Sequence, residues 1–569
     1  MNLTPEEKRI GKNNFNEYIN KTRSDMLTRR EFLAASAVAA AVPSVGLGTF
    51  YFGYNKVKDP IRVGVIGTGD EGSVLISNIN PDYLQVVAIS DIRPYNQWRA
   101  FHGDQRSPGT YAARQGLMNV YGWKSEDEAK KKVKVYEDYK ELLKQSDIEA
   151  VIIAVPLVQH HPIAMAAMQA GKHVLTEKLM AHDIAQCKEM GRTSQEQNLL
   201  LATGHQRHYS VLYDNAVHTI RQDVIGKIHH IRAQWHRNNS PLKDSWKPPL
   251  PHEWADELKS VSEKLDRAKS AADIERYQKA KTLLEMQLLD KTVDAAKYGY
   301  QGGTVPGEGS LEPYTYGALE ELIRWRLWDR TGGGLMAELG SHQLDAASIF
   351  ISALREDGKK VRPLAVYCNG GRHTFTNDRD SADHVYCTYE FPAQPYFDTD
   401  SGYKYDGYEQ DPEKKIVVTY SSINGNGYGG YGEVVAGTKG TMILDAEKDA
   451  YLFLGASTKT QITVKKDAAV SAYETAGGTI DAVETNALGS YPPSRGYQEE
   501  MEHFAWCIRN RDPENKPRCY PEVAMADAIL ALTANISMKL NRRIEFKEEW
   551  FDMDHPDCPE DLLKNPSVV

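Results

Sequence analysis

A glycine-rich turn between a strand and a helix is the feature that most restricts how this chain can fold. Residues 61–66 form a β-branched run that predicts a strand, and Gly-Thr-Gly-Asp-Glu-Gly follows at once over residues 67–72. A helix is expected to about Asn78, and a second strand over residues 85–90 ends at Asp91, 19 residues after the third glycine. Strand, GxGxxG turn, helix and acidic residue in this order predict the first unit of a dinucleotide-binding Rossmann fold.

The glycines of this turn have separate tasks. Gly67 permits the tight turn, Gly69 lets the backbone approach a pyrophosphate, and Gly72 lets the helix pack closely on the strand. The free N–H groups at the start of the helix then face the phosphates. We expect these glycines and Thr68 to bind the cofactor; a flavodoxin-like turn without a ligand is the alternative.

The end of the second strand bears on the choice of cofactor. A carboxylate at Asp91 accepts hydrogen bonds from a ribose diol and repels a 2′-phosphate, which favours NAD. Arg93 follows two residues later and leaves NADP open. Both side chains are therefore included in the predicted cofactor site.

Strands and helices continue to alternate up to about residue 206. Strands are expected over residues 150–155, 173–176 and 199–202, with helices over 136–145, 162–170 and 183–197. This pattern predicts an α/β domain with a parallel, doubly wound sheet over residues 59–206.

The alternation stops near residue 207. Strand-like segments such as 227–237 and 382–391 then predict an α+β domain with a largely antiparallel, open sheet over residues 207–548. A charged stretch at about 250–300, with apolar residues repeating every three or four positions, predicts a helical insertion with a break near Asp273. A lid, an oligomer arm and plain decoration are all open for it. Residues 549–569 form a C-terminal tail.

The N-terminus carries a candidate export signal. Residues 28–33 read Thr-Arg-Arg-Glu-Phe-Leu, and an apolar, alanine-rich run continues to about Tyr54. Paired arginines before such a run are typical of a twin-arginine leader, here residues 1–58, and an amphipathic helix is the alternative. We therefore expect a partner in the twin-arginine translocation machinery and a location in the periplasm, free or anchored to the membrane. Whether the leader is removed stays open.

Composition excludes several other classes. The apolar share of 41% and charged share of 26% are those of a globular protein, and a net charge of −10 argues against a nucleic-acid partner. Six scattered cysteines without a CxxC motif predict neither a disulfide scaffold nor a metal site.

Several separate motifs resemble one family. They are Val-Pro-Leu-Val-Gln-His at 155–160, Gly-Lys-His-Val-Leu-Thr-Glu-Lys at 171–178, Gly-Gly-Gly…Glu-Leu-Gly-Ser-His-Gln-Leu-Asp at 332–345, and Gly-Thr-Lys-Gly at 437–440. In this order they are similar to the glucose–fructose oxidoreductase/inositol dehydrogenase (Gfo/Idh/MocA) family, from about residue 60 to 547. The chain departs from the family pattern at Leu157 for Asn, Leu179 for Pro and Glu338 for Asp.

The resemblance implies a distinct role for each of three residues. His342 is expected as the catalytic acid/base, Lys178 as the residue that contacts both cofactor and substrate hydroxyls, and Glu338 as the residue that positions the sugar. Glu338 and His342 are spaced i,i+4 and share one face if the segment is helical. A histidine that is simply satisfied within its helix is the alternative for His342.

Further residues complete the predicted site. Cofactor contacts are expected from Pro156, His160 and Glu177 at the strand ends, and from Arg207 at the cofactor or the domain junction. Trp235 and Arg237 end a strand that forms the substrate floor in the family. An ordinary core or interface role remains the alternative for Trp235.

The combined prediction is an NAD(P)-dependent oxidoreductase acting on a ring hydroxyl of a sugar, sugar derivative or polyol. The family resemblance and the export signal together imply a tightly bound nicotinamide and a homo-oligomer. Two alternatives stay open: an NAD-dependent glycoside hydrolase or lyase that oxidises its substrate transiently, and an inactive sugar-binding relative.

Overall fold

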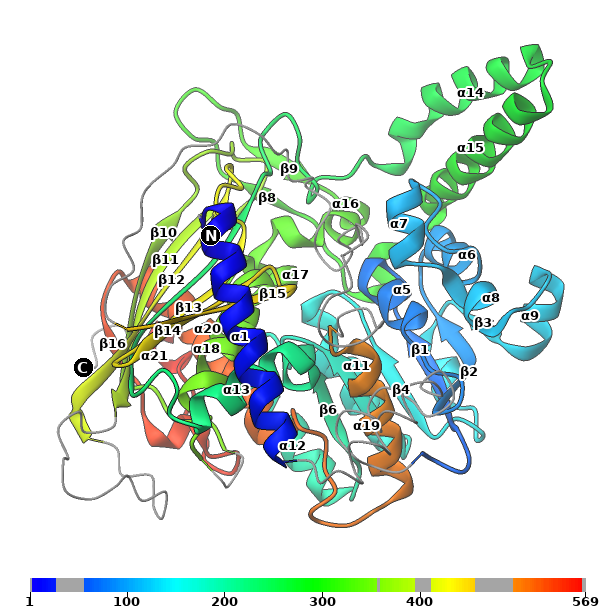
Figure 1. Cartoon of the computed structure of the whole chain (residues 1–569). Coiled ribbons are helices and arrows are strands. Elements are labelled where there is room, and N and C mark those ends of the chain that lie inside the picture. Colours follow the sequence, from blue (N-terminus) through cyan, green and yellow to red (C-terminus); the bar gives the residue numbers. More distant parts are fainter. Residues whose placement is uncertain (1–2, 27–55, 356–358, 394–410, 456–494, 565–569) are drawn as a thin grey trace.

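Two sheets organise the protein, as the computed structural model shows for residues 3–26, 56–355, 359–393, 411–455 and 495–564 (Figure 1). The first sheet is parallel, with the strand order β3-β2-β1-β4-β5-β6. Its strands are β1 Ile61–Ile66, β2 Leu84–Ser90, β3 Lys134–Tyr136, β4 Ala150–Ile153, β5 His173–Glu177 and β6 Leu201–Gly204. This is the predicted doubly wound arrangement. The predicted twin-arginine pair and the apolar run after it lie outside the described residues.

Helices cover both faces of the Rossmann sheet. One apolar core joins the sheet to α5 Asp70–Ser77, α6 Pro94–His102 and α19 Tyr497–Arg509. The other core joins it to α11 His160–Gln169 and α12 Ile184–Glu196. Because α19 follows the second domain in the sequence, the chain returns to complete the first.

The second sheet has eight strands in the order β15-β14-β13-β7-β12-β11-β10-β16. Among the described strands, every neighbouring pair is antiparallel except β7 with β12. The bounds are β7 Ile228–Arg237, β10 Ala365–Gly371, β11 His384–Ala393, β12 Asp411–Asn424, β13 Tyr431–Gly437, β14 Gly440–Asp445, β15 Asp449–Leu454 and β16 Ile544–Glu545. The predicted fold class is therefore confirmed in both domains.

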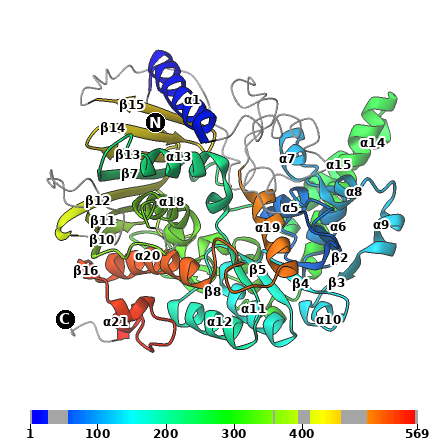
Figure 2. The same cartoon turned by 60° about the horizontal axis from the view of Figure 1, so that its bottom comes forward.

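Helices α13 Val211–Arg221, α18 Ser341–Ile351 and α20 Pro521–Leu540 lie beside this sheet (Figure 2). Within the described residues, α20 alone is long and apolar enough to cross a membrane. Yet 78% of its most apolar window is buried inside the protein, as expected of a core helix. Helix α1 Pro5–Met26 packs on the edge strand β15, where Lys12 Nζ lies 2.6 Å from an Asp449 carboxylate oxygen.

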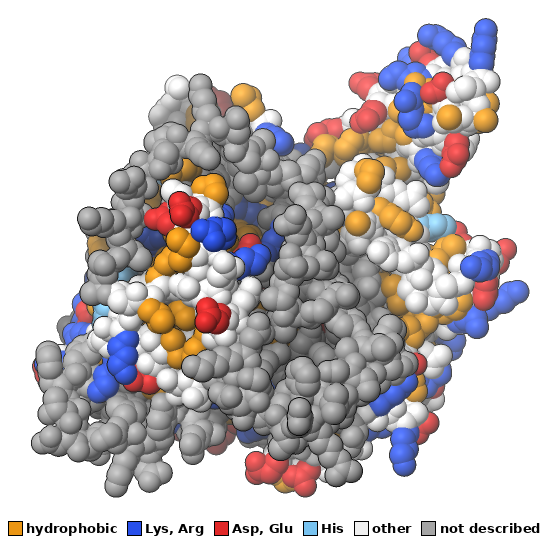
Figure 3. All heavy atoms as spheres, in the orientation of Figure 1, with side chains coloured by type: hydrophobic (Ala, Val, Ile, Leu, Met, Phe, Trp, Pro, Cys, Tyr) orange, Lys and Arg blue, Asp and Glu red, His pale blue; other side chains and the backbone are white. Residues whose placement is uncertain are grey.

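The insertion forms a helical arm that projects from the body (Figure 1). Helices α14 Ala255–Arg267 and α15 Ala271–Leu289 pack against each other, and positive and negative side chains are interspersed over their surface (Figure 3). The break lies at residues 268–270, slightly before the position expected near Asp273, because the Ser270 side chain caps α15. After the arm, 3₁₀ turn η5 Ala295–Tyr298 returns the chain to the Rossmann domain.

Candidate active site

The glycine turn opens into a cavity of about 1000 Å³ between the two domains. Gly67 has a φ of +86°, and a side chain at Gly72 would place Cβ 2.1 Å from the Gly67 carbonyl oxygen. At Gly69, by contrast, the atoms nearest to an added Cβ would be 3.8 Å away, so the turn is open there. Within the described part of the chain, no side chain caps the first turn of α5. The turn therefore offers the close backbone approach and the free helix N-terminus that a pyrophosphate requires.

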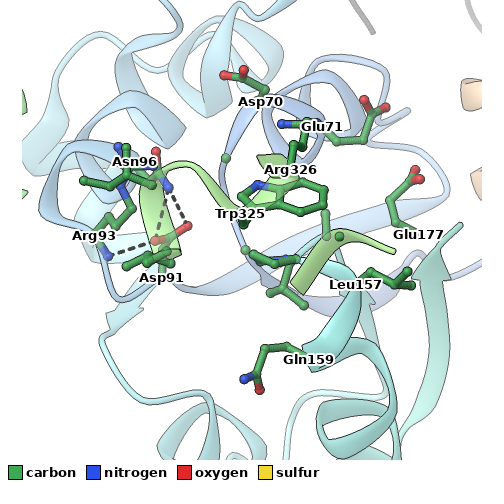
Figure 4. Close-up of a pocket in the computed structure, with 18 of the residues that line it drawn as sticks. Asp70, Glu71, Asp91, Arg93, Asn96, Leu157, Gln159, Glu177, Trp325 and Arg326 are labelled. Atoms are coloured by element: carbon green, nitrogen blue, oxygen red, sulfur yellow. Dashed lines mark hydrogen bonds between the residues drawn. The ribbon is translucent and has the colours of Figure 1, made fainter. Parts of the chain in front are cut away.

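Asp91 lies at the carboxyl end of β2, on the cavity wall (Figure 4). Its carboxylate accepts hydrogen bonds from the Thr68 and Arg93 main-chain N–H groups, both at 2.8 Å, and from the Asn96 side chain. Burial raises the pKa of Asp91, and these hydrogen bonds oppose that rise. Thr68 itself is fully buried and holds Asp91 in place, so its side chain does not face the cavity.

His160 is buried and contacts the backbone just after strands β4 and β5. Its ring nitrogens lie 2.7 Å from the Leu179 carbonyl oxygen and 3.0 Å from the Val155 carbonyl oxygen. Burial lowers its pKa to about 4. Pro156 and His160 both border the cavity, and the contacts of His160 fix the backbone that follows Lys178.

Lys178 connects the two domains at the end of β5. Its ammonium donates to the Glu338 carbonyl oxygen at 2.9 Å and lies 3.5 Å from a Glu338 carboxylate oxygen. The other oxygen of Glu338 accepts a 2.6 Å hydrogen bond from Arg326 Nε. Lys178 and Glu338 are 160 positions apart in the sequence, so only the tertiary fold brings this group together.

His342 lies on the same wall, one turn after Glu338. Residues Met336–Gly340 form a π-helical turn that leads into α18, so the expected i,i+4 pair spans a change of helix type. Such π turns are frequent at functional sites. The His342 ring is 5.4 Å from Trp235, and it forms no hydrogen bond with any residue that the structure describes. Trp235 in turn stacks on Tyr431 and is 7% exposed.

At this wall, Glu338 is ionised and His342 is neutral at neutral pH. Burial favours a protonated Glu338, but Arg326 and Lys178 outweigh it and lower its pKa to about 2. Burial and the charge of Lys178 hold the pKa of His342 well below its usual value, so the ring is neutral at neutral pH. Burial raises the pKa of Glu71 to about 7 and that of Glu177 well above its usual value.

Four predicted site residues lie outside the cavity wall: Thr68, Gly72, Arg207 and Arg237. Arg207 is buried at the domain junction, where Nε donates to a Glu447 carboxylate oxygen at 2.9 Å and Nη1 to Gln343 at 3.2 Å. Arg237 is also buried, and its charge helps to lower the pKa of Glu338. Among the cofactor residues, Gly72 packs behind the turn instead of facing the cavity. Gly67, Gly69, Asp91, Arg93, Pro156, His160, Glu177, Lys178, Trp235, Glu338 and His342 do border it.

Sequence reasoning missed Trp325 and Arg326, which extend over the groove from the second domain (Figure 4). The Arg326 guanidinium carbon lies 4.2 Å from the centre of the Trp325 ring. The run Arg-Trp-Arg-Leu-Trp-Asp-Arg at 324–330, just before the triple glycine, was a usable signal for an aromatic and basic wall.

A buried polar cluster lies behind His342. Among the described residues, His205, Cys519 and Asp527 have ligand atoms close enough to hold a metal ion, as do His208, Asp345 and Asp527. The Lys360 ammonium lies 2.7 Å from Asp345 and 3.2 Å from Asp527. A side-chain cation thus already balances the two carboxylates.

Comparison with known proteins agrees with this geometry. Residues 61–205 match the Gfo/Idh/MocA family, described as an oxidoreductase family with an NAD-binding Rossmann fold. This part of the chain is therefore similar to the Rossmann domain of that family. The match covers the glycine turn, Asp91 and Lys178.

The curated proteins that this chain resembles differ in name. A "Glycosyl hydrolase family 109 protein" from Stenotrophomonas maltophilia is 29% identical over 237 residues, which is 40% of this chain and 46% of that protein. An "Inositol 2-dehydrogenase/D-chiro-inositol 3-dehydrogenase" from Lactiplantibacillus plantarum is 30% identical over 175 residues, 29% of this chain and 41% of that protein. The chain thus spans less than half the length of these relatives.

The crystal structure of the Caulobacter crescentus aldose-aldose oxidoreductase has a TM-score of 0.49 and 13% identity, covering 86% of this chain and all of that one.

Proposed function

We propose that this chain is an NAD-dependent oxidoreductase that transfers a hydride between a ring hydroxyl of a sugar, sugar derivative or polyol and a tightly held nicotinamide. The observation that carries the proposal is the meeting of Lys178, Glu338 and His342 at the cavity into which the glycine turn opens. A dinucleotide-binding turn and a candidate proton acceptor thus share one enclosed space. Both are required for oxidation of an alcohol.

The residues of the chain have distinct parts in this reaction. Nicotinamide, when bound, supplies the hydride acceptor and donor. A ring nitrogen of His342, which is neutral at neutral pH, takes the proton of the substrate hydroxyl. The Lys178 ammonium stabilises the negative charge that develops on the substrate oxygen. Glu338 stays ionised, orients Lys178 and accepts a hydrogen bond from a neighbouring hydroxyl.

A glycoside hydrolase or lyase is the second candidate, favoured by the relatives named for glycosyl hydrolase family 109. Oxidation of a ring hydroxyl to a ketone acidifies the adjacent C–H bond. Loss of that proton then expels the aglycone, water adds to the double bond, and return of the hydride restores the alcohol. The proton acceptor at His342 serves both reactions. They differ in whether NADH accumulates as the substrate is consumed.

Export fits the same proposal. We propose that the twin-arginine motif at residues 28–33 directs the folded chain, with its nicotinamide already loaded, to the periplasm, where it is free or membrane-anchored and assembles with copies of itself. A tightly held cofactor accords with a compartment in which the cofactor is not replenished. Cell fractionation that finds the chain only in the cytoplasm would contradict this proposal.

One experiment tests the function. Purified protein is denatured, and any released nicotinamide is identified by mass spectrometry. The folded protein is then incubated with aryl glycosides and free sugars. NADH formed in proportion to an intact oxidised glycoside supports the oxidoreductase, whereas aglycone release without net NADH supports the second candidate. Sugar binding without any nicotinamide would show an inactive relative.

Variants connect the activity to the site. Lys178→Ala and His342→Ala are expected to lower turnover about 10²- to 10⁴-fold, the usual contribution of a general acid–base group, while the nicotinamide stays bound. His161→Ala is the matched control, because His161 pairs with Glu189 at the surface. Wild-type rates in both site variants would place the chemistry elsewhere.

A further inference from the structure

The arm insertion contacts the cofactor end of the Rossmann domain through one buried carboxylate. Asp290 lies directly after α15 and is 1% exposed. One of its oxygens accepts a 2.8 Å hydrogen bond from Arg93 Nε, and the other accepts a 3.0 Å hydrogen bond from the Tyr95 main-chain N–H. A residue 197 positions away in the sequence therefore holds the arginine that follows Asp91.

Residues after Asp290 extend this contact along the edge of the sheet. The Gln159 side-chain amide donates to the Tyr298 carbonyl oxygen at 3.0 Å, and the Tyr298 hydroxyl donates to Glu137. Tyr300 is 3% exposed and close enough to Asp91 for that charge to raise its pKa. Ligands of doubly wound sheets bind outside the carboxyl ends of the strands. Residues 290–300 thus form a wall of the space beyond β2, where the adenosine of a bound dinucleotide would lie.

The charges at this wall are unfavourable for a phosphate. Asp91 and Asp290 contribute two carboxylates; the Arg93 guanidinium pairs with Asp290, and its charge also opposes the rise in the pKa of Asp91 that burial causes. The other arginines on this side of the cavity, Arg99, Arg106 and Arg114, are paired with Asp70 and Asp104. A 2′-phosphate beside the end of β2 would therefore meet two carboxylates and an arginine whose Nε is already bound.

We propose that Asp290 is a cofactor-selecting residue that keeps Arg93 from a 2′-phosphate and so makes the site choose NAD over NADP. The arm insertion then has a function at its base, independent of any role of its exposed tip. This inference rests on the proposed binding of a nicotinamide dinucleotide.

The test removes one charge and keeps the shape. Asp290→Asn retains an oxygen that can accept from the Tyr95 N–H, and it removes the carboxylate that pairs with Arg93 Nε. Purified full-length protein is equilibrated with equal concentrations of NAD and NADP, filtered and denatured, and the released dinucleotides are quantified by mass spectrometry. We expect the bound NADP:NAD ratio to rise at least ~10-fold, because a guanidinium released from Asp290 can donate two parallel hydrogen bonds to a phosphate. Asp294→Asn, an equal charge change at an exposed position of the insertion, should leave the ratio unchanged.

A second substitution identifies the group responsible. Arg93→Gln in the Asp290→Asn background should return the ratio to the wild-type value, whereas Arg93→Gln alone should not raise it. An unchanged ratio in folded Asp290→Asn protein, judged by its melting temperature, would overturn the role of Asp290 and leave the proposed function intact. If wild-type protein binds neither dinucleotide, the proposed function and this inference both fail.

Discussion

His342 is the side chain whose protonation most directly controls the proposed oxidation. Burial and the Lys178 charge hold its pKa well below the ordinary value of 6.5, so the neutral, proton-accepting form persists as the pH falls through 6.5. We expect kcat/KM for oxidation to stay level between pH 8 and about 6 and to decline only in more acidic solution. The residual activity of Lys178→Ala should lose rate at higher pH than the wild type, since one depressing charge is gone. A wild-type decline centred near 6.5 would show that the ring is solvated.

Single residues also show the limit of sequence reasoning at the site. The family resemblance pointed to Lys178, Glu338 and His342, and all three border one cavity. It gave no sign of Arg326, whose contact with Glu338 depends on a turn between β9 Tyr314–Tyr316 and the π-helical segment. A short local pattern predicts a residue's chemistry, but its partner across the domain boundary depends on tertiary packing.

The turn between β1 and α5 leads to a prediction that separates packing from binding. At Gly72 an added Cβ would lie 2.1 Å from the Gly67 carbonyl oxygen, so Gly72→Ala should destabilise the protein by roughly 1–3 kcal/mol. At Gly69 the nearest atoms are 3.8 Å away and φ is −65°, so Gly69→Ala should fold normally. Its methyl group would face the cavity and weaken dinucleotide binding. Thermal melting and nucleotide titration of both variants measure the two effects, and equal loss of stability would contradict the distinction.

Elements with a strong period were predicted well, and short ones were not. The strand expected at 150–155 corresponds to β4, and the long helix at 183–197 to α12. The helix expected over 136–145 is instead the end of β3 followed by the short α10 Tyr139–Leu143, because Asp138 caps α10 through the Lys140 N–H. The sequence pattern there contains too few residues of either period to locate the boundary.

At the scale of the whole molecule, the fold class followed from the sequence, but the route of the insertion did not. The alternating segments predicted a Rossmann sheet followed by a mainly antiparallel one, and both are present. The charged, amphipathic pattern at 250–300 predicted helices, yet nothing in it indicated that Asp290 would be buried against Arg93. Contacts between segments nearly 200 residues apart are set by packing of the assembled domains, which a local pattern does not encode.

The junction of the two domains depends on a buried ionic group, and its loss should affect both stability and activity. Arg207 follows the last Rossmann strand and pairs with Glu447 in the turn between β14 and β15, while its guanidinium carbon lies 6.0 Å from the centre of the Trp235 ring. Removing Arg207 leaves Glu447 with Arg495 as its remaining partner and takes away the cation 3.7 Å from buried Glu433, and the loss of a buried ion-pair partner costs ~3–5 kcal/mol. Arg207→Met should therefore lower stability by that amount, measured by chemical denaturation.

Activity should fall with it, because Trp235 packs beside His342 and loses its support. A Glu433→Gln change in the same chain should recover part of the stability, since Glu433 is fully buried and loses the Arg207 cation, whereas Glu447 keeps Arg495. Arg232→Met on the exposed face of β7 is the matched control. If Arg207→Met melts like this control, the domains are joined by apolar packing alone and the ionic group has no structural role.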